Sequence, residues 1–335
     1  MLAVVLGVPA AALLFFAAAD SVSPRSAGAP IAARLQVPYP AIVAHRGLSA
    51  WAPEETRPAY LMARAIGADY LEADVQRTRD GVLIALHDET LQRTTNVAAV
   101  FPDRRDRGPA AFSWAELQQL DAGAWWNAAH PDRARPSYVG LRILRLEELM
   151  ELARRPDLPS APGLYLETKD PEKYPGYERE LVALLAARGF LAPPPPGEAA
   201  PLIFQSFDAQ SLARLRELAP AVPRVLLVER KPKPDADGKK PRWEELVQKA
   251  QALGAGIGPS GYQGMPWHTG PAHRAGLLVH LYTINQSWQL RMLRQFGCDG
   301  VFTDTADLAR GVLGRAEPGY DRERALRAAF QATGY

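Results

Sequence analysis

Apolar, strand-like runs alternate along the chain with amphipathic segments of helical period. Such alternation predicts parallel strands joined by helices. Eight or more of these strands indicate a closed α/β barrel of the TIM (β/α)8 type. The pattern predicts strands at residues 41–44, 69–75, 82–86, 163–167, 202–205, 225–228, 255–258, 278–283 and 300–302.

The run at residues 82–86 differs from the others because a turn signal, Arg79-Asp80-Gly81, stands directly before it. A short turn favours a hairpin, in which the chain returns antiparallel to the preceding strand. We therefore predict that this run lies outside the barrel. The same hairpin would bring His87 back beside Asp74.

The length of 335 residues fits one barrel with additions. We predict a signal peptide or N-terminal anchor with a linker at residues 1–33 and the barrel at residues 34–316. A C-terminal helix is predicted within residues 317–335. Residues 89–142 interrupt the barrel pattern and are too long for a plain loop, so they should form a lid or a small insertion.

The insertion carries one clear helix start and several tryptophans. Ser113 is a helix cap, and Glu116 completes a capping box with it. Trp114, Trp125 and Trp126 either pack the insertion onto the barrel or cover a ligand.

The first residues suggest export. Residues 2–19 form an uncharged apolar run that ends in alanines before Asp20, and small residues suit cleavage by a signal peptidase. We predict an exported protein, periplasmic or extracellular. No Lys or Arg precedes the run, so an uncleaved membrane anchor and a cytoplasmic chain stay as alternatives.

Composition excludes some partners. The net charge is +2 and the basic residues are dispersed, so neither nucleic acid nor an acidic membrane surface is expected as a partner. The single cysteine, Cys298, cannot form an internal disulfide and is most simply a small buried group. The pattern does not specify an oligomeric state.

Three acids are predicted to project from strand ends toward one place. Glu72 and Asp74 share a face because strand side chains alternate, and Glu167 ends another strand. Unpaired carboxylates repel, so either cations neutralise them or their pKa values rise. Ca²⁺ or Mg²⁺ suits such oxygen ligands, whereas no cysteine or paired-histidine pattern indicates Zn²⁺. A salt-bridged network with Arg46 and Lys169 is the alternative.

Two of the six histidines, His45 and His87, fall at strand ends beside these acids. Imidazole exchanges protons near neutral pH. The pair therefore suits reaction at a phosphodiester, which needs a base for the attacking oxygen and an acid for the leaving oxygen. Arg46 can hold a phosphate oxygen through two hydrogen bonds, and Lys169 can supply point charge.

A series of short motifs follows in order along residues 41–313. They are His45-Arg46-Gly47, Pro53-Glu54-Glu55-Thr56, Glu72-Ala73-Asp74, His87-Asp88, Leu166-Glu167-Thr168-Lys169, Gln205-Ser206-Phe207, Tyr282-Thr283-Ile284-Asn285 and Gly300-Val301-Phe302-Thr303-Asp304. Any one motif is weak, but their order is specific. Together they resemble the glycerophosphodiester phosphodiesterase family, in particular its periplasmic bacterial type.

The resemblance implies a metal-dependent enzyme that converts glycerophosphodiesters into glycerol 3-phosphate and an alcohol. It implies one divalent cation, with Ca²⁺ favoured and Mg²⁺ as the alternative. A phospholipase D-type enzyme acting on lysophospholipids or sphingolipids is the second possibility, and a noncatalytic phosphate-binding barrel would require a lost histidine or ligand. The expected residues are His45, His87, Arg46 and Lys169 for catalysis, Glu72, Asp74 and Glu167 for the metal, Arg46, Lys169, Tyr282, Phe207 and Trp51 for the substrate, and Glu54 in support.

Two positions depart from the family pattern. Glu55 replaces the usual Asn in the Pro-Glu-Asn-Thr loop, which adds a negative charge near the phosphate site and alters the hydrogen bonding of the loop. Tyr282 stands where Trp is usual and offers a smaller stacking surface with a hydroxyl.

Overall fold

Parallel strands form a closed barrel in the structure, a computed structural model that describes residues 26–158, 160–232, 234 and 238–335. The hydrogen-bonded order is β7-β6-β5-β4-β2-β1-β9-β8. Isolated parallel bridges, Ile257 with Val279 and Ser260 with Tyr282, join the two ends of this order. The predicted TIM barrel is confirmed. Its strands are β1 (Ala41–Ala44), β2 (Tyr70–Arg77), β4 (Gly163–Thr168), β5 (Leu202–Ser206), β6 (Arg224–Val228), β7 (Gly256–Pro259), β8 (His280–Leu281) and β9 (Gly300–Thr303).

The hairpin prediction is confirmed. Strand β3 (Leu83–Ala85) pairs antiparallel with β2, with Val75 opposite Ala85, and lies off the barrel order. Gly81 allows the turn, since its φ of +88° lies in the left-handed region that glycine adopts without strain. The N–H of Leu86 donates to the carbonyl of Asp74, so the residue after it, His87, is carried back beside Asp74 in the middle of β2.

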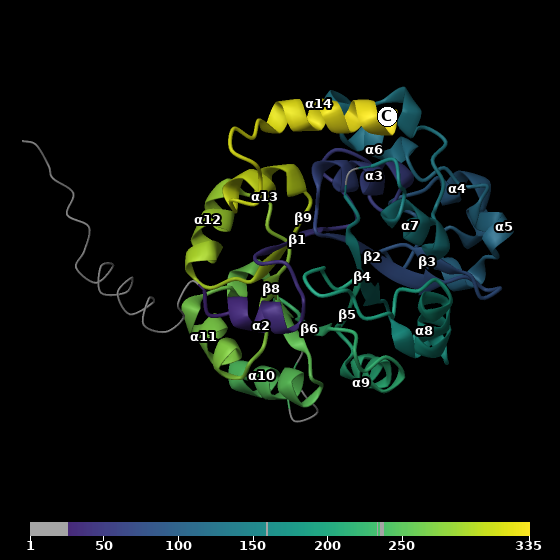
Figure 1. Cartoon of the computed structure of the whole chain (residues 1–335). Helices are drawn as coiled ribbons and strands as arrows, with labels where there is room; N and C mark the ends of the chain where they lie inside the picture. Colours follow the sequence, from purple (N-terminus) through teal and green to yellow (C-terminus); the bar gives the residue numbers. More distant parts are fainter. Residues whose placement is uncertain (1–25, 159, 233, 235–237) are drawn as a thin grey trace, which may run out of the picture.

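Helices surround the barrel (Figure 1). Helix α3 ends at Gly67, a left-handed C-cap, and α9 begins at Asp208, whose carboxylate accepts the N–H groups of Gln210 and Ser211. The helices and helical turns outside the insertion are α2 (Ala29–Arg34), α3 (Arg57–Ile66), α7 (Leu146–Ala153), η5 (Pro171–Lys173), α8 (Tyr177–Ala187), α9 (Ala209–Leu218), α10 (Trp243–Ala252), η6 (Gly261–Gln263), α11 (Pro266–Arg274), α12 (Ser287–Gln295), α13 (Ala306–Val312) and α14 (Arg322–Thr333).

Helix α11 was not predicted. The sequence indicates only a Gly-rich connection at residues 258–270, whereas a helix begins at Pro266 and continues through Pro271. Proline weakens a helix signal, although Pro266 stands at the helix start where its missing N–H costs nothing. The predicted strand at residues 278–283 is also shortened to the two residues of β8.

Helix α2 closes the end of the barrel where the strands begin. Its Ile31 and Ala32 are buried in one cluster with Tyr70, Tyr165 and Phe302, which fill the barrel interior. The predicted linker up to residue 33 is therefore partly helical. The apolar run at residues 2–19 lies outside the described residues, so export or anchoring stays a prediction. Among the described helices, none is long and apolar enough to cross a membrane.

The insertion follows β3 and is built from short helices. The capping box of Ser113 and Glu116 is confirmed, since each side chain accepts the other residue's N–H. Trp126 is fully buried against the edge of Tyr138, which shows that it packs the insertion. The elements are α4 (Val97–Val100), η1 (Pro102–Arg104), η2 (Pro109–Ala111), α5 (Trp114–Leu117), α6 (Ala124–Ala129), η3 (Pro131–Arg133) and η4 (Pro136–Tyr138).

Two further sequence expectations concern the outer helices and the cysteine. The C-terminal helix α14 forms and packs against α3, as Figure 1 shows. Cys298 is buried, and burial raises the pKa of its thiol to about 12. It is a packed interior group, as predicted, with little thiolate at neutral pH.

Candidate active site

A cavity of about 210 Å³ opens at the carboxyl ends of the barrel strands. This end of an α/β barrel carries the catalytic residues in enzymes of this fold. Its lining comes from segments far apart in the sequence and includes most of the predicted site. The lining residues are His45, Arg46, Glu72, Asp74, His87, Glu167, Lys169, Gln205, Phe207, Leu227, Tyr282, Thr283 and Phe302.

The three predicted acids meet in this cavity. Parallel pairing places Asp74 level with Glu167, because β2 and β4 are neighbours in register. Glu72 lies two residues before Asp74 and therefore on the same face. One oxygen from each of the three carboxylates lies within 4.8 Å of the others, and all three side chains are buried.

Burial and mutual repulsion change the ionisation of these acids. Burial, followed by the charge of Asp74, raises the pKa of Glu167 to about 8 and that of Glu72 well above its usual range. Burial opposes ionisation of Asp74 as well, but Lys169 and Arg46 hold its pKa below its ordinary value. Asp74 is therefore the most readily ionised member of the group, and the two glutamates hold protons more readily than free glutamates do.

Two cationic side chains enter the cluster from its rim. Lys169 Nζ lies 2.9 Å from Glu167 and 3.5 Å from Asp74. Arg46 Nε lies 3.3 Å from Asp74, and the backbone N–H of Arg46 donates to Glu72 at 2.7 Å. The salt-bridged network considered from the sequence is thus present in part. It leaves Glu72 without a cationic side chain, since its other contact is the Gln205 amide at 3.1 Å.

The donor set fits a divalent cation. Three carboxylates converge, and the buried Asp74 Oδ2 makes no hydrogen bond in the described structure, although it faces Arg46 Nε at 3.3 Å. Buried polar oxygens are normally satisfied, so this atom has capacity for a further ligand. Oxygen-only ligands suit Ca²⁺ or Mg²⁺ rather than Zn²⁺. The residues that would hold the ion are Glu72, Asp74 and Glu167.

Both predicted histidines are oriented by carboxylates. His45 Nδ1 lies 2.7 Å from Asp304 Oδ1, and His87 Nδ1 lies 2.7 Å from Asp88 Oδ1. Asp304 is itself held by the amide of Asn285 at 2.5 Å. A carboxylate on Nδ1 fixes the imidazole and directs proton exchange with a ligand to Nε2. Each histidine therefore belongs to a His–Asp pair.

The loop after β1 is held in an unusual backbone conformation. Arg46 and Glu55 have φ values of 56° and 55°, in the left-handed region that costs a residue with a side chain about 1 kcal/mol or more. Glu55 accepts the Asp74 N–H at 2.8 Å, so this carboxyl ties the loop to β2. Burial and Asp74 raise the pKa of Glu55 well above its usual range. A neutral carboxyl is favoured there, in contrast to the added negative charge expected from the sequence.

The aromatic residues proposed for the substrate fall into two groups. Phe207 and Tyr282 line the cavity and make an edge-to-face contact with centroids 5.9 Å apart. The Tyr282 hydroxyl donates to the Val228 carbonyl, so it is already engaged. Trp51, in contrast, does not line the cavity, and the guanidinium group of Arg133 lies 5.6 Å from its ring centroid.

Sequence reasoning missed several residues that support the site. Asp88 follows His87 directly and could have been found from that adjacency. Asp304 and Asn285 stand within quoted motifs, but the contact of Asp304 with His45 joins residues separated by more than 200 positions, and Asn285 acts on His45 only through Asp304. Only the closed barrel brings β1 and β9 side by side.

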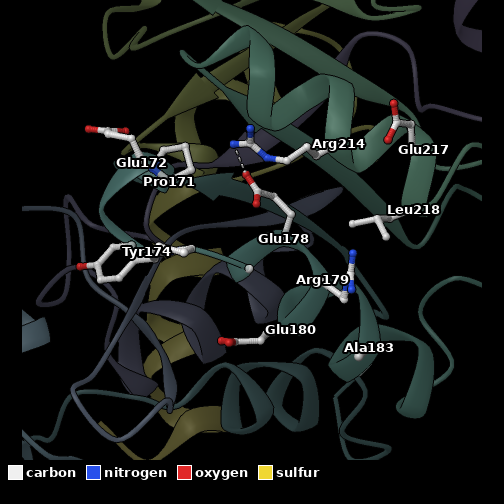
Figure 2. A pocket seen from close by; sticks show the side chains of 12 residues that line it. Pro171, Glu172, Tyr174, Glu178, Arg179, Glu180, Ala183, Arg214, Glu217 and Leu218 are labelled. Atoms are coloured by element: carbon white, nitrogen blue, oxygen red, sulfur yellow. Dashed lines mark hydrogen bonds and ion pairs between the residues drawn. The ribbon is translucent and has the colours of Figure 1, made fainter.

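A larger hollow lies elsewhere and is not the site. A space of about 880 Å³ lies between α8 and α9 on the outside of the barrel, and Figure 2 shows the side chains that line it. Two of its acidic side chains are paired, Glu178 with Arg214 and Glu180 with Arg77, each at 2.7 Å. No histidine is among its lining residues. The smaller cavity at the strand ends therefore carries the candidate chemistry.

Comparison with known proteins agrees with this geometry. The model of the glycerophosphoryl diester phosphodiesterase family matches residues 45–308. A glycerophosphodiester phosphodiesterase of Bacillus subtilis (strain 168) is 38% identical over 272 residues, which cover 81% of this chain and 85% of the relative.

Solved structures show the same architecture. A phosphodiesterase of Oleispira antarctica, solved in complex with the product sn-glycerol-3-phosphate, is 28% identical with a TM-score of 0.63 and covers 82% of this chain and 97% of its own. A glycerophosphodiester phosphodiesterase of Agrobacterium tumefaciens str. C58 is 27% identical with a TM-score of 0.58, over 81% and 99% of the two chains. The chain therefore belongs to the glycerophosphoryl diester phosphodiesterase family, and it is an enzyme of that family.

Proposed function

We propose that the protein hydrolyses small glycerophosphodiesters to glycerol 3-phosphate and an alcohol. His45 and His87 act as the acid and base, and one divalent cation is held by Glu72, Asp74 and Glu167. The observation that carries the proposal is the convergence of these residues in one cavity at the strand ends. The product bound to the Oleispira antarctica relative supports glycerol 3-phosphate as the product here.

The cation would offset the carboxylate charge and polarise a phosphate oxygen. Ca²⁺ is favoured because it tolerates irregular carboxylate geometry, and Mg²⁺ is the alternative. Around the ion site, Arg46 binds and orients the phosphate through its guanidinium group. Lys169 places positive charge near the oxygens on which negative charge grows in the transition state.

The two histidines exchange protons with the substrate at Nε2, because Nδ1 of each faces an aspartate. One imidazole accepts a proton from the attacking oxygen, and the other donates a proton to the oxygen of the leaving alcohol. The attacking oxygen is either the neighbouring hydroxyl of the glycerol unit, which would give a cyclic phosphate first, or water.

A second hollow beside the active site is the observation that favours the alternative of a lysophospholipid substrate. A space of about 470 Å³ shares Tyr282 and Thr283 with the active-site cavity. Its lining includes Met265, Met292 and Trp288, and Trp288 is 60% exposed. An acyl chain of a lysophospholipid would lie there. The catalytic cavity itself is small and brings charged side chains such as Arg46 and Lys169 to the phosphate site, and we therefore favour a small polar substrate.

Replacing Glu72, Asp74 or Glu167 singly by alanine should abolish tight binding of the cation and most activity, because each replacement removes one of the three converging carboxylates. Calorimetric titration with Ca²⁺ and Mg²⁺ measures the binding. Glu217→Ala, which removes an exposed acid on α9, is the matched control and should bind cation normally. Unchanged affinity in all three site variants would refute the metal assignment.

His45→Ala and His87→Ala should each lower kcat by about 10² to 10⁴ fold, the usual contribution of a general acid or base. The variant that lacks the acid should recover on a nitrophenyl ester, whose leaving group needs no proton, and the other should not. Steady-state kinetics on both substrates test this, with His130→Ala in the insertion as control. Equal losses on the two substrates would contradict separate roles.

Glycerophosphocholine and glycerophosphoethanolamine should be cleaved with a kcat/KM at least about tenfold above that for lysophosphatidylcholine. That ratio corresponds to about 1.4 kcal/mol of transition-state binding, which one pocket can supply. Trp288→Ala should leave cleavage of the small substrates unchanged. If monomeric lysophosphatidylcholine is the better substrate and Trp288→Ala weakens its cleavage, the lipid alternative is correct.

A further inference from the structure

Arg93, which no motif singled out, joins two carboxylates at the edge of the active site. Its Nε and Nη2 donate to Asp88 at 2.5 and 2.9 Å. Its Nη1 and Nη2 donate to Glu54 at 2.6 and 2.8 Å. The guanidinium group thus makes two-point contacts with both partners, the strongest form of such a pair.

Each of these carboxylates has an active-site group on its other side. Asp88 Oδ1 lies 2.7 Å from His87 Nδ1. Glu54 Oε1 accepts the Nη1 N–H of Arg46 at 2.8 Å. A continuous chain of charge-assisted contacts therefore runs from His87 through Arg93 to Arg46.

Building on the proposed function, we infer that Arg93 is a positioning residue for the reaction. Through Asp88 it fixes the imidazole of His87, and through Glu54 it fixes the guanidinium group of Arg46. It touches neither the cavity nor the predicted metal ligands.

The geometry requires arginine. Only a planar fork with several N–H groups can engage two carboxylates at two points each, whereas a lysine ammonium is a single point charge. Without the guanidinium group, Asp88 and Glu54 would face each other as like charges and would separate. Glu54 is largely buried and depends on this contact: burial opposes its ionisation, but Arg93 and Arg46 hold its pKa below its usual value.

Arg93 itself belongs to the insertion and connects it to the site. Its guanidinium group lies 5.6 Å from the ring centroid of Trp125, which belongs to α6. This is a cation–π distance, and the contact helps to hold the guanidinium group in place. Trp125 therefore supports Arg93 from a helix of the same insertion, whereas Trp126 is buried in the main core cluster with residues of the barrel.

The side chain of Arg93 is 43% exposed, and Glu54, its more buried partner, keeps its contact with Arg46 when Arg93 is replaced. Exposed ion pairs contribute little to folding. A small displacement of a catalytic group, in contrast, lowers the rate strongly. Removal of Arg93 should therefore change catalysis while the midpoint of thermal unfolding stays close to that of the unaltered enzyme.

The test uses Arg93→Met, which keeps the length of the side chain and removes the charge. With the cation-loaded enzyme and glycerophosphocholine, kcat should fall about 10- to 100-fold, a range typical of residues that orient catalytic groups. KM should rise as well, since Arg46 binds phosphate. Arg93→Lys should restore only part of kcat.

Double variants test whether Arg93 affects kcat through His87. In a His87→Ala background, Arg93→Met should no longer lower kcat, because the imidazole it positions is gone, although the rise in KM should persist. In a His45→Ala background, the full loss of kcat should remain. Arg104→Met, which removes a similar arginine that pairs with Glu116 and lies over Phe112 in the insertion, should leave both constants unchanged.

The outcomes separate this inference from the proposed function. If His87→Ala alone leaves kcat intact, the assignment of the histidines fails. If His87→Ala is inactive as expected but Arg93→Met lowers kcat equally in both histidine backgrounds, or lowers the unfolding midpoint in proportion to activity, then Arg93 does not act through His87 and the inference is wrong. An Arg93→Met enzyme with unaltered kcat would overturn it as well.

Discussion

The electrostatic repulsion among Glu72, Asp74 and Glu167 is the constraint around which the site is built. Burying one unpaired carboxylate is costly, and the register of β2 and β4 brings three together. Arg46 and Lys169 offset part of the negative charge. The raised pKa values of Glu72 and Glu167 indicate that the rest of this charge is not offset. A divalent cation would supply the balance.

Charges alternate outward from this cluster. Beyond the cations at its rim lie Glu54, Asp88 and Asp304, each in contact with an arginine or histidine of the cavity. One exposed arginine then joins two of these three acids. Such alternation fixes flexible cationic side chains in single positions, which matters more for a reaction than the modest free energy of each exposed pair.

The features that were predicted correctly from the sequence are those that depend on local patterns of residues. Strand alternation placed Glu72 and Asp74 on one face, and a three-residue turn signal placed His87 beside them. Local sequence patterns did not indicate contacts between distant strands. The pairing of His45 with Asp304, for example, requires that β1 lies beside β9. Other differences have local causes. Two prolines in α11 weaken the helical pattern of its sequence. The ring of Trp51 packs beside Arg133 of the insertion instead of lining the cavity.

Proton release on cation binding tests the central claim, that a buried and partly protonated carboxylate cluster holds a divalent cation. Because burial and Asp74 raise the pKa of Glu167 to about 8 and that of Glu72 above its usual range, these carboxyls hold protons more readily than free glutamates and must lose them to become ligands. Calorimetric titration of Ca²⁺ at pH 7, in two buffers of different ionisation enthalpy, should show release of about one proton or more. The release should decline as the pH rises through 8 to 9, while the affinity increases. Binding without proton release at pH 7, or no binding at any of these pH values, would contradict the account.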